Sequence, residues 1–148
     1  FIIGFPTETW EEIRETIRIA EDINVDYAKI FIAIPLRNTE MFDLAEKTNS
    51  LIMDTYDGES MWTVGGAIKS DEWTADDLTI LRAYEWDRIN FSDPNKRKKI
   101  AERMQVTEKE LNKIRRNTLS NALKAITSRQ TQKGTPTTKA ADVVLTNN

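Results

Sequence analysis

The side chains that could do chemistry here are restricted to carboxylates, lysines, tyrosines and hydroxyls, because the 148 residues include neither cysteine nor histidine. Thiolates and imidazoles are the usual ligands of zinc and iron-sulfur sites, and histidine is the commonest general base. We therefore assign no metal ligand and no catalytic residue within this chain.

Two pairs of adjacent carboxylates are the remaining candidates for acid-base chemistry, Glu11 with Glu12 and Asp76 with Asp77. Each pair follows a threonine at the start of a predicted helix. Acidic side chains are favoured there because the first turn carries the positive end of the helix dipole. We interpret both pairs as helix-start residues and not as a catalytic dyad.

Charge is distributed unevenly along the chain. Residues 1–93 contain 8 basic and 20 acidic side chains, whereas residues 94–130 contain 11 basic and 3 acidic ones. The formal net charge of the whole chain is −3. Such asymmetry predicts either two units or an acidic body with a basic arm.

The composition is that of a globular protein, with 39% hydrophobic and 30% charged residues. No apolar run approaches the roughly 20 residues of a membrane-spanning helix. The opening FIIGF has no initiator methionine and no basic segment before it, so it is not a signal peptide and reads as a chain cut within a strand. We expect a cytoplasmic location and no membrane partner.

The first third of the chain predicts a strand, a helix and a second strand. Residues 1–6 (FIIGFP) and 27–35 (YAKIFIAIP) are apolar runs that end in proline, as buried strands do. Between them, Thr9 and Glu12 have the spacing of a capping box for a helix over 10–22. This order predicts parallel strands joined by a right-handed crossover.

Further helices are predicted over 39–47, from Thr74 to about residue 90, from Pro94 onward, and after Thr107. The stretch between the first two contains glycines and no periodicity, so we read it as a covering loop. Its Trp62 is a candidate substrate contact. Trp86 is interpreted as core packing, and Trp73 as either a cover or a packing residue. We divide the chain into a strand-helix part, a covering loop, a helical extension and a disordered tail: residues 1–47, 48–73, 74–130 and 131–148.

Two motifs in this order resemble a known family. FIIGFPTET, a helix, and FIAIPLRNTEMFDLAEK resemble the fifth and sixth strand-helix units of radical S-adenosylmethionine enzymes, especially the group that often carries a cobalamin-binding domain. Family members typically read GLFIIGFPGET in the fifth strand and ATPYPGTELY after the sixth. The matching residues are Phe1, Ile2, Ile3, Gly4, Phe5, Pro6, Glu8, Thr9, Ala33, Pro35, Thr39, Glu40, Met41 and Phe42.

The resemblance implies an α/β fold: the last strand-helix units of a partial TIM-like radical S-adenosylmethionine barrel, followed by an α-helical C-terminal extension. The working face of such barrels lies at the carboxyl ends of the strands. By family likeness Ile2 and Gly4 would pack on the adenine of S-adenosylmethionine, and backbone groups near Ala33 and Ile34 would read its edge. The implied cofactor-binding residues are Ile2, Gly4, Phe5, Pro6, Ala33, Ile34 and Pro35.

The sequence departs from the family pattern after each strand. Thr7 replaces a glycine, and Leu36, Arg37 and Asn38 replace a Tyr-Pro-Gly turn. These differences leave the expected fold intact. They change the expected shape of the pocket rim and therefore leave the substrate, a small molecule of unknown identity, unassigned.

Members of the family hold a four-iron four-sulfur cluster on Cys-x-x-x-Cys-x-x-Cys after the first barrel strand. The reduced cluster cleaves S-adenosylmethionine to a 5′-deoxyadenosyl radical, and methyl transfer is frequent where cobalamin is present. This chain has no cysteine, so the resemblance implies a C-terminal fragment whose partner is the missing N-terminal part of the same protein. It would hold part of the S-adenosylmethionine site and be inactive alone, with the cluster in the parent protein only and cobalamin an open possibility.

A non-enzymatic function remains as the alternative. In KIAERMQVTEKELNKIRR, a small residue at Ala101, a turn near Gln105 and a basic helix resemble a helix-turn-helix that binds DNA or a protein partner. The usual turn glycine is replaced by Gln105. We consider nucleic acid the less favoured partner, and we interpret the KRKK run at 96–99 as a solvated face.

Two parallel strands with a helix on one face leave open edges and an uncovered sheet face. Isolated parallel pairs of this kind are not expected to be stable in water. We therefore expect the chain to fold poorly or aggregate when it is expressed alone.

Overall fold

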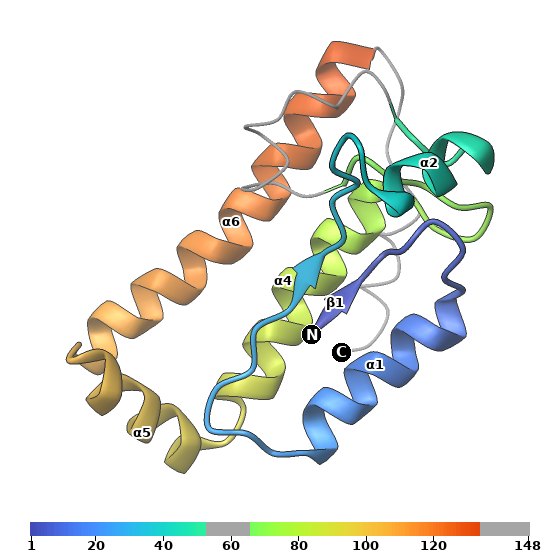
Figure 1. Ribbon diagram of the computed structural model, residues 1–148. Coiled ribbons are helices and arrows are strands. Elements are labelled where there is room, and N and C mark those ends of the chain that lie inside the picture. The colour runs from blue at the N-terminus through green and yellow to red at the C-terminus, as the bar shows by residue number, and fades with distance from the viewer. Residues whose placement is uncertain (53–65, 134–148) are drawn as a thin grey trace.

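The computed structural model describes residues 1–52 and 66–133, and it consists of two short strands and five helices within those ranges. The ribbon in Figure 1 shows helices arranged around the two strands. The elements in chain order are β1 (Ile2–Ile3), α1 (Trp10–Asp22), β2 (Phe31–Ile32), α2 (Glu40–Lys47), α4 (Ala75–Phe91), α5 (Pro94–Met104) and α6 (Glu108–Lys133).

The two strands form a parallel pair, which confirms the predicted pairing. Ile2 lies opposite Phe31, and Ile3 lies opposite Ile32. The Phe31 amide donates to the carbonyl of residue 1 over 3.0 Å, and the Ala33 amide donates to the Ile3 carbonyl over 2.8 Å. The ladder is therefore longer than the two-residue strands, although shorter than the two predicted apolar runs.

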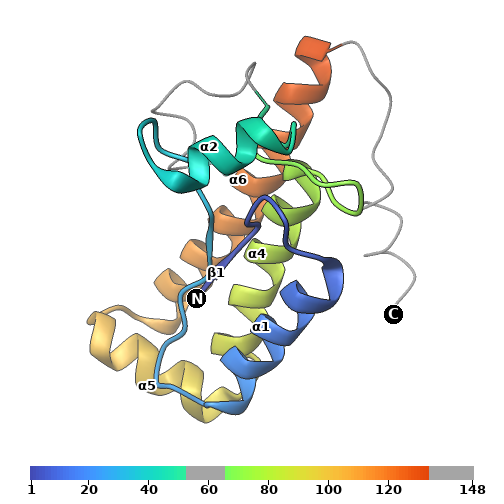
Figure 2. The ribbon, with the colours of Figure 1, turned by 45° about the vertical axis from the view of Figure 1, so that its right-hand side comes forward.

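One face of the strand pair is covered by helices α1 and α4. Its Ile3 and Ile32 belong to a buried cluster with Ile13 and Ile17 of α1 and Leu78 of α4. In Figures 1 and 2, α4 runs alongside the strands and α6 lies on the far side of α4. The layers are thus strands, the helices α1 and α4, and then α6.

Three helices start with the cap that the sequence predicts. The hydroxyls of Thr9 and Thr74 accept from the third helical amides, while Glu12 and Asp77 accept from the threonine amides. Thr107 and Glu110 make the same reciprocal bonds at the start of α6. Both acidic pairs lie in first helical turns, as predicted.

Helix α6 packs along α4, and α5 closes the end of this pair. A second buried cluster joins Phe91 to residues of α5 and α6: Ile100, Ala101 and Leu111. Gln105 occupies the turn between the two helices with a φ of 55°. This left-handed conformation ends α5 at the position where the motif usually has a glycine.

Helix α6 continues to Lys133, so its last three residues fall within the predicted tail. Residues 131–133 include no helix breaker, and Gly134 is the first residue that favours an end. The rest of the predicted tail, residues 134–148, lies outside the described residues.

Part of the predicted covering loop is ordered. Leu51 forms an antiparallel bridge with Ile68, and the Lys69 amide donates to the Ser50 carbonyl over 2.9 Å. Residues 53–65, which include Trp62, lie outside the described part of the chain. Among the described helices, none is both long and apolar enough to cross a membrane.

Candidate functional site

The strand face opposite the helices exposes two large apolar side chains. Ile2 is 50% exposed and its neighbour Phe31 is 56% exposed, whereas Ile3 and Ile32 are 0% and 7% exposed. Paired residues in a sheet project to the same side, so Ile2 and Phe31 form one apolar surface. We call this pair the open face.

The turn after β1 requires its glycine. Gly4 has a φ of +86°, and a Cβ there would lie 2.5 Å from Cδ1 of Leu78. The Glu8 carboxylate accepts hydrogen bonds from the amides of Gly4 and Phe5. Gly4 and Glu8 of the FIIGFPTET motif therefore have local physical roles in closing this turn.

The seven predicted site residues lie on two segments that run in the same direction, since β1 and β2 are parallel. Ile2 and Phe5 are exposed, and Ile34 is half-buried. The other four are buried: Gly4, Pro6, Ala33 and Pro35. The predicted site is thus a mixture of exposed side chains and buried backbone.

The structure bears on the expected role of Gly4 in packing against the adenine. Leu78 of α4 fills the side to which a Cβ would point, so that side offers no surface to a ligand. The exposed apolar atoms come instead from Ile2 and Phe31. Sequence reasoning missed Phe31 as a site candidate, and only the strand register could have indicated it.

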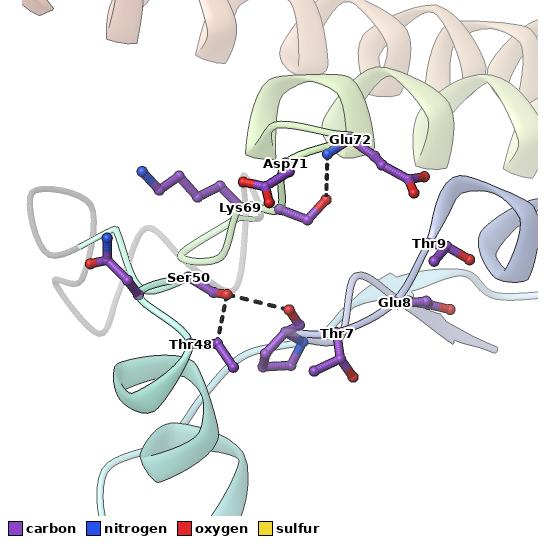
Figure 3. A pocket seen from close by; sticks show the side chains of 11 residues that line it. Thr7, Glu8, Thr9, Thr48, Ser50, Lys69, Asp71 and Glu72 are labelled. Atoms are coloured by element: carbon purple, nitrogen blue, oxygen red, sulfur yellow. Dashed lines mark hydrogen bonds between the residues drawn. The ribbon is translucent and has the colours of Figure 1, made fainter.

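A polar cleft of about 380 Å³ lies beyond the end of β1. Figure 3 shows the side chains of Thr7, Ser50 and Asp71 around it, each from a different segment. The Ser50 hydroxyl donates to the Pro6 carbonyl over 3.3 Å and lies 2.8 Å from the Thr48 hydroxyl. The lining residues are Pro6, Thr7, Glu8, Thr9, Thr48, Asn49, Ser50, Lys69, Ser70, Asp71 and Glu72.

Two tryptophans fix the segment that borders this cleft. The indole N–H of Trp73 donates to the Glu8 carbonyl over 2.7 Å, and the indole N–H of Trp10 donates to the Glu72 carbonyl over 2.9 Å. Trp73 is buried in the main core, which settles its predicted role as packing. These bonds hold the turn after β1 against residues 70–73.

Trp86 packs as predicted. Its ring meets the ring of Phe91 edge-on with centroids 5.1 Å apart, and its indole N–H donates to the Tyr27 hydroxyl over 2.9 Å. It therefore links α4 to the segment that leads into β2, away from the polar cleft.

What the strand ends offer a ligand is the apolar surface of Ile2 and Phe31. The amides of Gly4, Phe5 and Ala33 already donate to groups within the chain. No cluster of three or more potential metal-ligating acids occurs among the described residues. The absence of cysteine and histidine from the sequence excludes the commonest ligands of transition metals from this chain.

Comparison with known proteins gives one informative match. Over 81 residues the chain is 35% identical to an uncharacterized methyltransferase of Pyrococcus horikoshii. The chain is similar to part of a methyltransferase. This similarity covers 55% of the chain but 17% of the methyltransferase, so the chain spans a small part of its relative's length. No protein-family model matches the chain, and no solved structure matches it.

Proposed function

We propose that this chain is the C-terminal portion of a radical S-adenosylmethionine enzyme and forms the adenine-side wall of the S-adenosylmethionine site. The observation that carries the proposal is the open face, on which Ile2 and Phe31 expose about half of their surfaces beside the strand ends. The partial match to a methyltransferase supports an enzyme that uses this cofactor.

The parallel strand pair supports the proposal that this chain is a fragment of a larger barrel. Parallel sheets are nearly always covered on both faces, and the usual cover comes from further strand-helix units. Here α1 and α4 cover one face, while Ile2 and Phe31 remain exposed on the other. In a barrel, that second face points to the interior, which is where the remaining strands would close around it.

The residues at the strand ends fit the adenine of S-adenosylmethionine. An adenine ring has apolar faces and a polar edge, so it needs an apolar wall beside backbone donors and acceptors. Ile2 and Phe31 supply the wall, and the backbone of Ala33 and Ile34 lies at the adjoining strand end. When bound, S-adenosylmethionine supplies the reactive group, and these residues orient it and exclude water.

The chain does not fit an iron-sulfur cluster, because it has no cysteine. A cluster in the parent enzyme would be held by residues outside this chain. We derive no step through it and assign no cobalamin contact here. Among the residues of this chain, we assign a binding role and no catalytic role.

The reading frame upstream of Phe1 tests this proposal. If the chain is a C-terminal fragment, the upstream sequence should encode several strand-helix units. It should also contain three cysteines spaced three and two residues apart. A start codon directly before Phe1 would contradict the proposal, because the cluster would have no ligands. A long upstream frame that lacks the three cysteines would equally contradict membership of the radical family.

A further inference from the structure

The middle of helix α4 carries a half-buried arginine without a partner. Within residues 1–52 and 66–133, the guanidinium of Arg82 forms no ion pair and no hydrogen bond. Burial lowers the pKa of Arg82, because the charged form loses contact with water. Arginines that are withdrawn from water are normally paired, since an unpaired buried charge is costly. This side chain therefore lacks a counter-charge.

Two other arginines of the same helical layer show what Arg82 lacks. Arg88 donates to both oxygens of the Glu21 carboxylate, at 2.6 and 2.8 Å. Arg115, which is also half-buried, donates to both oxygens of the Asp87 carboxylate, at 2.7 and 2.8 Å. These hydrogen bonds raise the pKa values of both arginines. The fold thus pairs these two side chains and leaves Arg82 with its donors unused.

The neighbours of Arg82 on α4 show which way it faces. Leu78, one turn earlier, lies against Gly4 at the end of β1. Trp86, one turn later, donates to the Tyr27 hydroxyl in the segment that leads into β2. Residues four positions apart share one side of a helix. Arg82 therefore lies between these two contacts, on the side of α4 that faces the strand pair.

The side chain of Arg82 should lean toward the carboxyl ends of the strands. Helical side chains lean toward the N-terminus of their own helix. The N-terminal end of α4 lies at the carboxyl end of β1, because Leu78 lies against Gly4 and the Trp73 indole donates to the Glu8 carbonyl. Ligands of parallel α/β folds bind at this end of the strands.

We propose that Arg82 binds the anionic group of a small-molecule ligand, a carboxylate or a phosphate. The guanidinium is a planar fork of donors that matches two oxygens of either group. This contact would add a charged anchor to the apolar surface of the open face. The inference does not depend on which cofactor the open face binds.

The acid nearest to Arg82 along the helix is engaged elsewhere. Glu85 accepts from Arg88 over 2.7 Å, on the side of α4 where Arg88 also donates to Glu21 of α1. In the described part of the chain, no carboxylate raises the pKa of Arg82. No acid of that part therefore lies close enough to replace the ligand or to repel it.

The test follows the arginine Nε–H signals of the full 148-residue chain by NMR. Sodium phosphate or sodium succinate is added at constant ionic strength, and the Arg82→Lys variant assigns the Arg82 signal by its loss. We expect this signal to shift along a saturating curve with half-saturation at or below about 10 mM. Saturation by phosphate alone would identify a phosphate ligand, and saturation by succinate alone a carboxylate.

Two other signals in the same spectra are the controls. Arg116 is exposed on α6 and forms no ion pair within the described residues, so it reports adventitious contact with any arginine. Its signal should not saturate below about 100 mM. The Arg115 signal should not move, because Asp87 already occupies its fork.

Thermal melts provide a second measurement that needs no ligand. Arg82→Met removes an unpaired charge and keeps an apolar stem, so Tm should rise or stay within about 1 °C of wild type. Arg115→Met leaves the Asp87 carboxylate without its partner and should lower Tm by at least about 3 °C.

Three results would overturn the proposal. The first is an Arg82 signal that does not saturate with either anion below about 100 mM. The second is equal half-saturation at Arg82 and Arg116, which would mean an adventitious ion only. The third is an Arg82→Met variant that loses as much Tm as Arg115→Met, because the guanidinium would then have a partner within the chain.

Discussion

The two faces of the β1-β2 pair have almost the same composition and opposite environments. Ile3 and Ile32 lie under α1 and α4 and are buried, whereas Ile2 and Phe31 are about half exposed. The difference comes from the position of the helices and not from the residue types. In the function that we propose, the cofactor would cover this exposed apolar surface.

The largest expected difference between the two faces is in stability. Ile3→Ala removes a fully buried side chain and should lower the free energy of unfolding by about 2–5 kcal/mol. Ile2→Ala truncates an exposed side chain and should change it by less than about 0.5 kcal/mol. Urea unfolding followed by tryptophan fluorescence at low protein concentration measures both. Equal losses would mean that Ile2 is also buried in solution.

A methyl group at Gly4 tests how tightly α4 closes the covered side. Gly4→Ala should cost about 2–4 kcal/mol, because alanine is strained at this positive φ and its Cβ meets Leu78. Leu78→Ala removes the clash but leaves the backbone strain. The double variant should therefore lose less stability than the sum of the two single variants. Strict additivity in the urea measurement would show that Leu78 does not lie over Gly4.

A buried amide also ties α4 to the strand side. The Asn90 side chain accepts from the Ala28 amide over 2.8 Å and donates to the Ala28 carbonyl over 2.9 Å. Asn90→Ala leaves both backbone groups without these bonds and should cost about 1–3 kcal/mol in urea unfolding. The exposed Asn121→Ala on α6 is the matched control and should change stability little. An Asn90→Ala variant with the same free energy of unfolding as the wild type would show that these bonds do not stabilise the packing of α4.

The smallest expected effect is on thermal stability at low pH, and it should be the same for the caps of α1 and α6. Hydrogen bonds from Thr9 and Thr107 lower the pKa values of Glu12 and Glu110 below their ordinary value. Their stabilisation is present above the unfolded pKa and is lost as the pH falls through the folded pKa. In thermal melts, Glu12→Gln and Glu110→Gln should each flatten the decrease in Tm below about pH 4.5. A decrease in Tm as steep as that of wild type in either variant would contradict this linkage.

Local signals in the sequence predicted the helices well. A threonine followed three positions later by an acid located the starts of α1, α4 and α6, because the reciprocal bonds involve neighbours only. Parallel pairing followed from two apolar runs separated by one helix. Helix α6 extends three residues into the predicted tail, because its last residues are polar but include no helix breaker.

The site depends on contacts that spacing cannot reveal. FIIGF and FIAIP are apolar at consecutive positions and do not alternate with polar residues, so the sequence does not say which side of each strand is covered. The polar cleft combines three segments, and the Leu78 contact with Gly4 joins residues far apart in the chain. The cofactor assignment combines the open face with a family resemblance and stays a prediction.

The most direct test of the central claim compares two exposed isoleucines on different surfaces. Ile2 lies on the open face, and Ile19, which is 44% exposed, lies on the outside of α1. In the parent enzyme that we propose, calorimetric titration measures S-adenosylmethionine binding to Ile2→Asp and Ile19→Asp. We expect Ile2→Asp to weaken binding by at least about tenfold, or about 1.4 kcal/mol, and Ile19→Asp to leave it unchanged. Equal affinities in the two variants would contradict the claim that the open face forms the wall of the cofactor site.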